Sequence, residues 1–119
     1  MKPPAYSCRR GIYTLKEVYE FETGITSNSG GSIARVVFSD CGHLSIGAGF
    51  DWDAGSGDDA ILAATLAHEA LYALIYAGEI DKQHRVSVDK YYREVLKLCG
   101  VGLIWRNYYF WTKRMFGSV

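Results

Sequence analysis

Residues 61–77 read ILAATLAHEALYALIYA, and this stretch decides how the rest of the chain can fold. Apolar residues occur almost all round its helical circumference, which is typical of a helix enclosed by other elements. The stretch is slightly short for a membrane span, and His68 and Glu69 lie at its middle, where an ionisable pair would be costly in lipid. We therefore predict a buried central helix over about residues 60–77 and no transmembrane segment.

The polar side chains of this helix fall on one face, because they recur at three- and four-residue steps: Thr65, His68, Glu69, Tyr72, Tyr76 and Glu79. A buried polar face needs polar partners opposite it, because unpaired buried groups are costly. The nearest candidates are the Asp51–Asp59 loop and a downstream helix on which Arg85, Asp89 and Tyr92 share one face. The sequence therefore predicts a polar cluster where the loop, the central helix and the second helix meet.

The residues before the central helix have the texture of strands and turns. Candidate strands lie at residues 18–21, 33–38 and 44–46, and Asp40–His43 is a plausible hairpin turn between the last two. Residues 1–12 are expected to form an N-terminal arm, in which two adjacent prolines block regular structure.

Helices account for the second half of the chain. Asp58 or Asp59 can cap the central helix, a second helix is expected from Ser87 to about Cys99, and a third covers Leu103–Phe116. Strands followed by helices within 119 residues predict a single α+β domain over residues 13–119. In this domain a small antiparallel sheet packs with about three helices.

The overall composition limits the classes of partner and cofactor. Thirteen Lys and Arg residues balance thirteen Asp and Glu residues, so no global field attracts nucleic acid and no nucleic-acid partner is expected. The three cysteines are widely spaced and include no CxxC pair, so no zinc site is predicted. No cofactor is predicted, although a divalent metal stays open at Asp53, His68 and Asp89.

The centre of the main helix offers two chemical interpretations. His68-Glu69-Ala-Leu-Tyr72 begins like the HExxH zinc motif, but Tyr72 stands where the second His ligand is needed, so that match fails. A hydrolase remains open, with His68 as a general base that activates a water and Asp53 or Asp89 orienting it. Alternatively, His68 and Glu69 belong to a buried structural network. A catalytic cluster must open into a cleft, whereas a structural one should be closed and fully paired.

The last predicted helix is rich in aromatic side chains, because residues 104–111 read IWRNYYFW. One face is expected to pack on the domain: Ile104, Tyr108, Trp111 and Met115. The other aromatic residues then need a second surface. Aromatic residues with a few Arg are typical of interface hot spots. We predict an interface here with contact residues Trp105, Tyr109, Phe110 and Trp111; a helix buried on both sides within the fold is the alternative.

The order of these motifs resembles a small domain of unknown function encoded by tailed bacteriophages and prophages. The resemblance covers roughly residues 18–117. Its motifs are Gly49-Phe50-Asp-Trp-Asp53-Ala-Gly-Ser56, His68-Glu69-Ala-Leu71-Tyr72, Arg85-Val-Ser-Val-Asp89, Gly100-Val101 and Phe116-Gly117. The chain departs from the family at Glu69, where the family usually has Asp, and at Asp58, where it often has Pro.

The resemblance implies which residues form the polar cluster: Asp53, Ser56, His68, Glu69 and Asp89. Under the hydrolase interpretation His68, Glu69, Asp53 and Asp89 would be catalytic, and the binding residues would be Ser56, Tyr72 and Arg85. Since Glu69 lengthens the carboxylate arm by one methylene, activity at such a site is in doubt.

The resemblance and the aromatic helix together predict a phage accessory or virion-associated (tail or structural) protein that acts by protein–protein binding. Its partners would be other phage proteins or a second copy of the chain, in the virion or in the host cytoplasm. Two alternatives are a small hydrolase acting on the host envelope or a nucleotide, and an inhibitor of a host factor.

Overall fold

The computed structural model describes residues 2–27, 30–54 and 59–116. Seven strands precede three α-helices, which is the predicted α+β class. The strands are β1 (Tyr6–Arg9), β2 (Ile12–Leu15), β3 (Tyr19–Glu22), β4 (Gly31–Ile33), β5 (Val36–Phe38), β6 (His43–Ile46) and β7 (Asp51–Trp52). The helices are α1 (Asp59–Tyr76), the short 3₁₀ helix η1 (Lys82–His84), α2 (Arg85–Leu98) and α3 (Leu103–Phe116).

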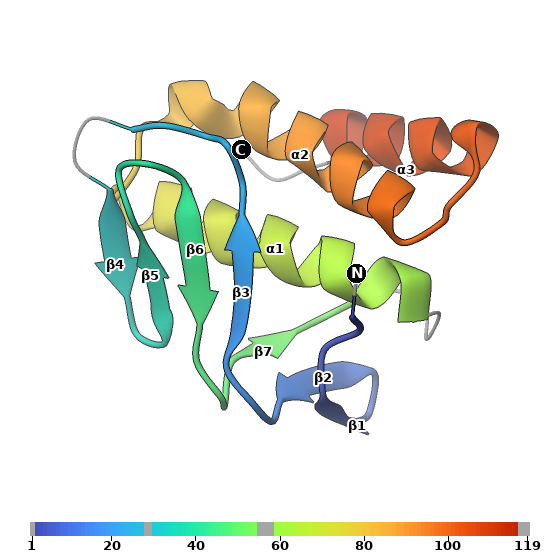
Figure 1. Cartoon of the computed structure of the whole chain (residues 1–119), viewed down its shortest axis with the longest axis horizontal. Helices are drawn as coiled ribbons and strands as arrows, with labels where there is room; N and C mark the ends of the chain where they lie inside the picture. Colours follow the sequence, from blue (N-terminus) through green and yellow to red (C-terminus); the bar gives the residue numbers. More distant parts are fainter. Residues whose placement is uncertain (1, 28–29, 55–58, 117–119) are drawn as a thin grey trace.

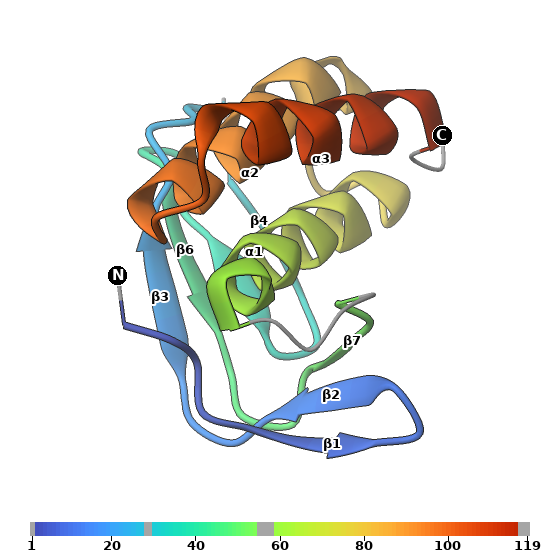
Figure 2. The ribbon, with the colours of Figure 1, turned by 90° about the vertical axis from the view of Figure 1, so that its right-hand side faces the viewer.

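Helix α1 lies at the centre of the molecule, as the sequence predicts. The two sheets cover one side of it, and α2 and α3 cover another (Figures 1 and 2). Its alanine and leucine side chains are buried all round the helix, including Leu62, Ala64, Leu66, Ala67, Ala70, Leu71 and Leu74. The small alanines allow neighbouring elements to approach the helix closely, so the apolar circumference becomes the core of the domain.

Glycines end both α1 and α2 in the same way. Gly78 and Gly100 have φ angles of 75° and 87°, a conformation that favours glycine. The Gly78 N–H donates to Ile75 O, and the following N–H of Glu79 donates to Leu74 O. This pair of bonds is the Schellman motif, which satisfies carbonyl groups at the helix end.

The strands form two antiparallel sheets rather than a single one. The three-stranded sheet has the order β1-β2-β7 and the four-stranded sheet has the order β3-β6-β5-β4. The predicted strand at residues 33–38 is interrupted, because Ile33 pairs with Val36 across a two-residue turn in which Arg35 has a φ of 68°. The predicted turn at Asp40–His43 is present, since the Ser39 N–H donates to His43 O.

The segment expected as an N-terminal arm contains strand β1. It pairs with β2 through a two-residue turn at Arg10 and Gly11, both of which have positive φ, as tight hairpins of this kind require. The hairpin brings β2 alongside β7, which leads directly to the loop before α1.

Helix α2 runs antiparallel to α1, and α3 runs antiparallel to α2 (Figure 1). Helix α2 begins two residues before the predicted Ser87, after an η1 turn in which the Asp81 carboxylate accepts from the Gln83 N–H. Helix α3 has the predicted bounds. Over the described residues, none of the helices has the length and apolarity that crossing a membrane requires.

The outer surface of the four-stranded sheet carries an ionic cluster. His43 of β6 lies between two carboxylates of β3, with Nδ1 contacting Glu22 and Nε2 3.3 Å from Glu20. Hydrogen bonds to Glu22 and then Glu20 raise the pKa of His43 above its ordinary value of 6.5. The folded state therefore favours the protonated imidazole.

We predict that His43→Gln removes a pH-dependent part of the stability. The protonated His43 stabilises the fold fully below pH 6.5, and this contribution is lost as the pH rises through the higher pKa of the folded state. The difference in melting temperature between the natural chain and His43→Gln should therefore shrink from pH 5.5 to pH 8. The effect should be small because the cluster is exposed. A difference in melting temperature that grows with pH would contradict the raised pKa of His43.

Candidate functional site

The polar face of α1 meets α2 at a buried carboxylate. His68 Nε2 lies 2.7 Å from Asp89 Oδ1, and the Tyr72 hydroxyl donates to the same oxygen over 2.8 Å. His68 and Tyr72 are each 5% exposed and Asp89 is fully buried. His68 and Tyr72 are one helical turn apart, so α1 presents both donors to a single acceptor on α2.

Aromatic rings enclose the imidazole of His68. The Tyr72 ring stacks on it at a centroid distance of 4.3 Å, and the Tyr92 ring of α2 lies 5.2 Å away. Burial lowers the pKa of His68, and the opposing effect of its hydrogen bond with Asp89 does not reverse this shift. The imidazole is therefore neutral near pH 7, and its Nε2–H donates to the Asp89 carboxylate.

Arg85 lies at the first turn of α2, beside the hydroxyl group of Tyr72. Burial raises the pKa of Tyr72, although its hydrogen bond with Arg85 acts in the opposite direction. Of the buried side-chain nitrogen and oxygen atoms in the described residues, only Arg85 Nε lacks a hydrogen-bond partner. Apart from this one atom, the buried cluster around His68 has the paired character expected of a structural network.

The remaining members of the polar face connect α1 to both sheets. Near its start, the Thr65 hydroxyl accepts from Trp52 Nε1 of β7 over 3.2 Å and is within hydrogen-bond distance of Ile61 O. Beyond its end, the Glu79 carboxylate accepts from the Ser32 N–H of β4 over 3.0 Å. Together with Asp89 of α2, partners on three separate elements therefore form hydrogen bonds with the polar side chains on one face of the helix. Sequence reasoning missed Trp52, although it lies inside the Phe50–Asp53 motif.

Glu69 lies at the edge of the cluster. It is half-buried, and its Oε2 accepts from the backbone N–H of Asp53 at 3.4 Å. Burial raises the pKa of Glu69, whereas this hydrogen bond and the charge of Lys113 lower it. Lys113 of α3 was not predicted as a site residue. Its charge also lowers the pKa of His68, so α3 contributes to the electrostatics of this region.

The predictions of Ser56 as a binding residue and of a metal site remain. Ser56 lies outside the described residues. Within the described part of the chain, no three His, Cys, Asp or Glu side chains are grouped so that they could hold a metal ion. A metal bound by Asp53, His68 and Asp89 therefore stays a prediction from sequence.

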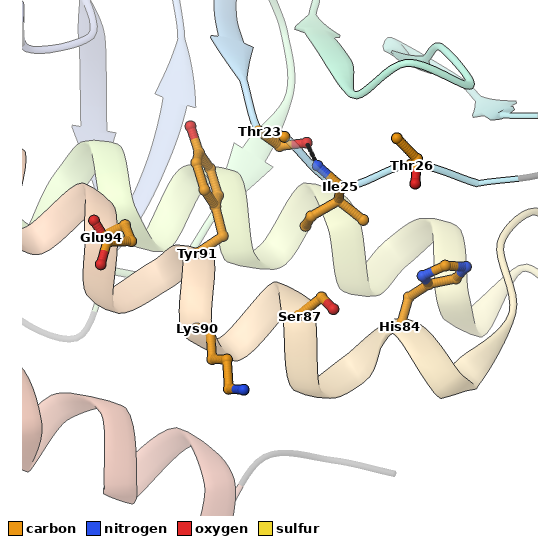
Figure 3. Close-up of a pocket in the computed structure, with 9 residues that line it drawn as sticks. Thr23, Ile25, Thr26, His84, Ser87, Lys90, Tyr91 and Glu94 are labelled. Atoms are coloured by element: carbon orange, nitrogen blue, oxygen red, sulfur yellow. Dashed lines mark hydrogen bonds between the residues drawn. The ribbon is translucent and has the colours of Figure 1, made fainter.

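A shallow groove of about 430 Å³ lies elsewhere, between the segment that follows β3 and one face of α2 (Figure 3). Tyr91 of α2 reaches towards the chain at Thr23 and Ile25. The Thr23 hydroxyl is already bonded, because it accepts from the Ile25 N–H and donates to Gly42 O. The predicted catalytic residues do not line this groove, so the polar cluster does not open into it.

Helix α3 packs against α2 through a face that mixes polar and aromatic residues. Phe110 is buried, and the guanidinium of Arg93 lies 4.7 Å from the centre of its ring. Arg93 also contacts the Asn107 amide, at 3.5 Å, and Lys113 Nζ lies 5.7 Å from the centre of the Tyr92 ring. The contacts of Arg93 thus hold against α2 the face of α3 that carries Asn107 and Phe110, which are three residues apart.

The opposite face of α3 is exposed and apolar. Ile104, Trp105, Tyr108 and Trp111 are 82%, 61%, 57% and 59% exposed. This reverses the predicted orientation, in which Ile104, Tyr108 and Trp111 pack on the domain. The sequence pattern is ambiguous because both faces of the helix are aromatic, and the partners on α2 decide between them.

The four predicted contact residues therefore divide between the two faces. Trp105 and Trp111 are accessible, Tyr109 is half-buried against the core, and Phe110 points inward. The side chains of Met115 and Phe116 lie outside the described residues. A large exposed apolar surface rich in Trp and Tyr is typical of an interaction site.

No protein-family model, curated protein or solved structure matches this chain. The resemblance to a family of phages and prophages therefore stays a prediction from its motifs.

We predict that His68→Ala lowers the free energy of unfolding by at least about 2 kcal/mol, because it leaves the Asp89 carboxylate short of a donor and opens a cavity. Tyr72→Phe should cost about 1 kcal/mol, because it removes one hydrogen bond and keeps the ring. Urea denaturation measures both values, with the exposed Val37→Ala as a control. Unchanged stability of His68→Ala would show that the network does not hold α1 to α2.

The lowered pKa of His68 predicts a second pH effect, opposite in sign to that of His43. Below pH 6.5 the unfolded chain binds a proton at His68 before the folded chain does, so stability falls as the pH falls below 6.5. The loss continues down to the pKa of the folded state. Urea denaturation between pH 5 and pH 8 in a His43→Gln background isolates this effect, with His43→Gln/His68→Gln as the reference. A stability that rises on acidification relative to this reference would contradict a neutral His68.

Proposed function

We propose that this chain is a phage-encoded accessory or virion-associated protein that acts by protein–protein binding through α3, to another phage protein or to a second copy of the chain. The exposed face of α3 carries the proposal: Ile104, Trp105, Tyr108 and Trp111 are each more than half exposed. The largest apolar patch on the surface of a protein is often a functional site. The motif resemblance supports the phage origin, and the aromatic face supports the mode of action.

The chemistry of this face suits a protein partner. Trp and Tyr are the residue types most enriched among binding hot spots, because each removes a large apolar area from water at little entropic cost. The rings of Trp105 and Tyr108 contact each other edge to face, at a centroid distance of 6.0 Å. Such contacts limit ring motion before binding, which reduces the entropy lost in the complex.

Under this proposal the polar cluster is structural. His68, Tyr72 and Asp89 hold α1 against α2, and α2 in turn supports α3 through Arg93. The closed environment of His68 favours this role over catalysis, since a general base must reach a substrate or a water.

Two other functions make different demands on the same structure. A hydrolase would need the edge of the cluster at Glu69 to admit substrate, and the raised pKa of Glu69 is the observation that favours it. An inhibitor of a host factor would use the same face of α3 as an accessory phage protein, so the identity of the bound protein separates these two.

Site-specific photocrosslinking tests the proposal. The full chain, with p-benzoylphenylalanine at position 108 or position 105, is produced in its native cells and irradiated, and crosslinked peptides are identified by mass spectrometry. We expect both positions to give crosslinks to one region of one protein. Position 37 is the matched control, because Val37 is 58% exposed on β5 and Tyr108 is 57% exposed.

The identity of the crosslinked protein distinguishes the alternatives. A virion protein supports a structural role, and a host protein supports an inhibitor. Crosslinking at positions 105 and 108 that does not exceed the control at position 37 would overturn the binding function.

A further inference from the structure

The exposed face of α3 is free of charge among the residues whose side chains are described. Ile104, Tyr108 and Trp111 form a stripe at i, i+4 and i+7, flanked by Trp105 and Thr112. In a two-fold symmetric contact every residue of a patch meets the same patch, so a charged residue near the axis would face its own kind. A face without charge avoids this repulsion.

The two basic side chains of α3 that the structure describes, those of Arg106 and Lys113, are directed towards its own domain. Arg106 Nη1 lies 3.4 Å from Val101 O, and Lys113 Nζ lies over the ring of Tyr92. These groups are therefore not arranged around the exposed stripe. A partner with an acidic rim, or an anionic membrane surface, would find no described cationic side chain on this face to pair with. The charge distribution favours an uncharged apolar partner.

The size of the face is consistent with contact between two copies. Three aromatic side chains about 60% exposed, together with Ile104, present roughly 500 Å² of apolar surface, taking the usual 150–250 Å² for a whole aromatic side chain. Two such faces bury roughly 1,000 Å², which is near the lower limit for a specific interface. The net charge of zero adds no general repulsion between copies.

We propose that the partner of this face is a second copy of the chain, bound as a reversible dimer by antiparallel packing of α3 on α3. This inference rests on the proposed binding function and names its partner. Antiparallel packing places the start of each helix beside the end of the other, which is favourable for the two helix dipoles. The two-fold axis passes near Tyr108, so Ile104 of each copy packs against Trp111 of the other.

Sedimentation equilibrium of the full chain between 1 and 500 μM tests the dimer. We expect the apparent mass to rise with concentration from 13.3 kDa towards twice that value. Ile104→Glu and Trp111→Lys should each remain monomeric, with the dissociation constant raised at least tenfold, because each places an unpaired charge in the contact. Val37→Glu is the control with matched exposure and should dimerise like the natural chain.

Mixing the two variants tests the antiparallel register. In a mixed dimer the new carboxylate at position 104 meets the new amine at position 111, while the natural Trp111 and Ile104 meet on the other side of the axis. We expect an equimolar mixture of Ile104→Glu and Trp111→Lys to form a heterodimer although neither forms a homodimer. A mixture that stays monomeric while the natural chain dimerises would overturn the antiparallel register.

A natural chain that is monomeric at 500 μM would overturn the dimer but leave the proposed function standing if positions 105 and 108 crosslink to a different protein. A natural chain that is monomeric at 500 μM and gives no crosslinking above the control at position 37 would overturn both the dimer and the proposed binding function.

Discussion

Asp89 places a carboxylate in the fully buried contact between α1 and α2, where such a group is stable only if hydrogen-bond donors surround it. His68 and Tyr72 supply two of them to one oxygen. Since both donors come from adjacent turns of α1, a rotation or a one-residue shift of that helix would leave the carboxylate facing an apolar neighbour. This interaction therefore fixes the position of α2 along α1, which apolar contacts between alanines and leucines specify less sharply.

The position of α2 in turn determines the outer part of the molecule. Arg93 projects from α2 towards α3, where its guanidinium meets the Phe110 ring and the Asn107 amide. Helix α3 has these contacts on one side and water on the other. The orientation of the exposed aromatic face is thus a consequence, two steps removed, of the buried network at His68. The buried network at His68 and the exposed aromatic face of α3, which look unrelated in the sequence, are thus connected through α2 and Arg93.

The clustering of titratable groups on α1 has a structural explanation that needs no catalytic role. The polar groups on this face bind different elements of the fold. Thr65 meets Trp52 of β7, His68 and Tyr72 meet Asp89 of α2, and Glu79 meets Ser32 of β4. Each of these polar contacts helps to specify how one neighbouring element is placed against the buried helix. The lowered pKa of His68 follows chiefly from burial, with a contribution from the charge of Lys113, and so does not identify an active site.

The sequence by itself determined the central helix, the α+β class and the meeting of His68 and Tyr72 with Asp89. These features follow from helical periodicity and from the high cost of unpaired buried groups, both of which act within or between short segments. The sequence did not reveal the strand at residues 6–9 or the turn at Arg35, because both depend on tight turns in which an arginine, Arg10 or Arg35, has a positive φ. It did not reveal the division into two sheets either, because that depends on pairing between residues far apart in the chain, such as Tyr13 and Trp52. Only the tertiary structure decided which face of α3 is exposed. Both faces carry aromatic residues, so the positions of the aromatic residues do not distinguish them, and the side chains of Arg93 and Tyr92 on α2 determine which one packs.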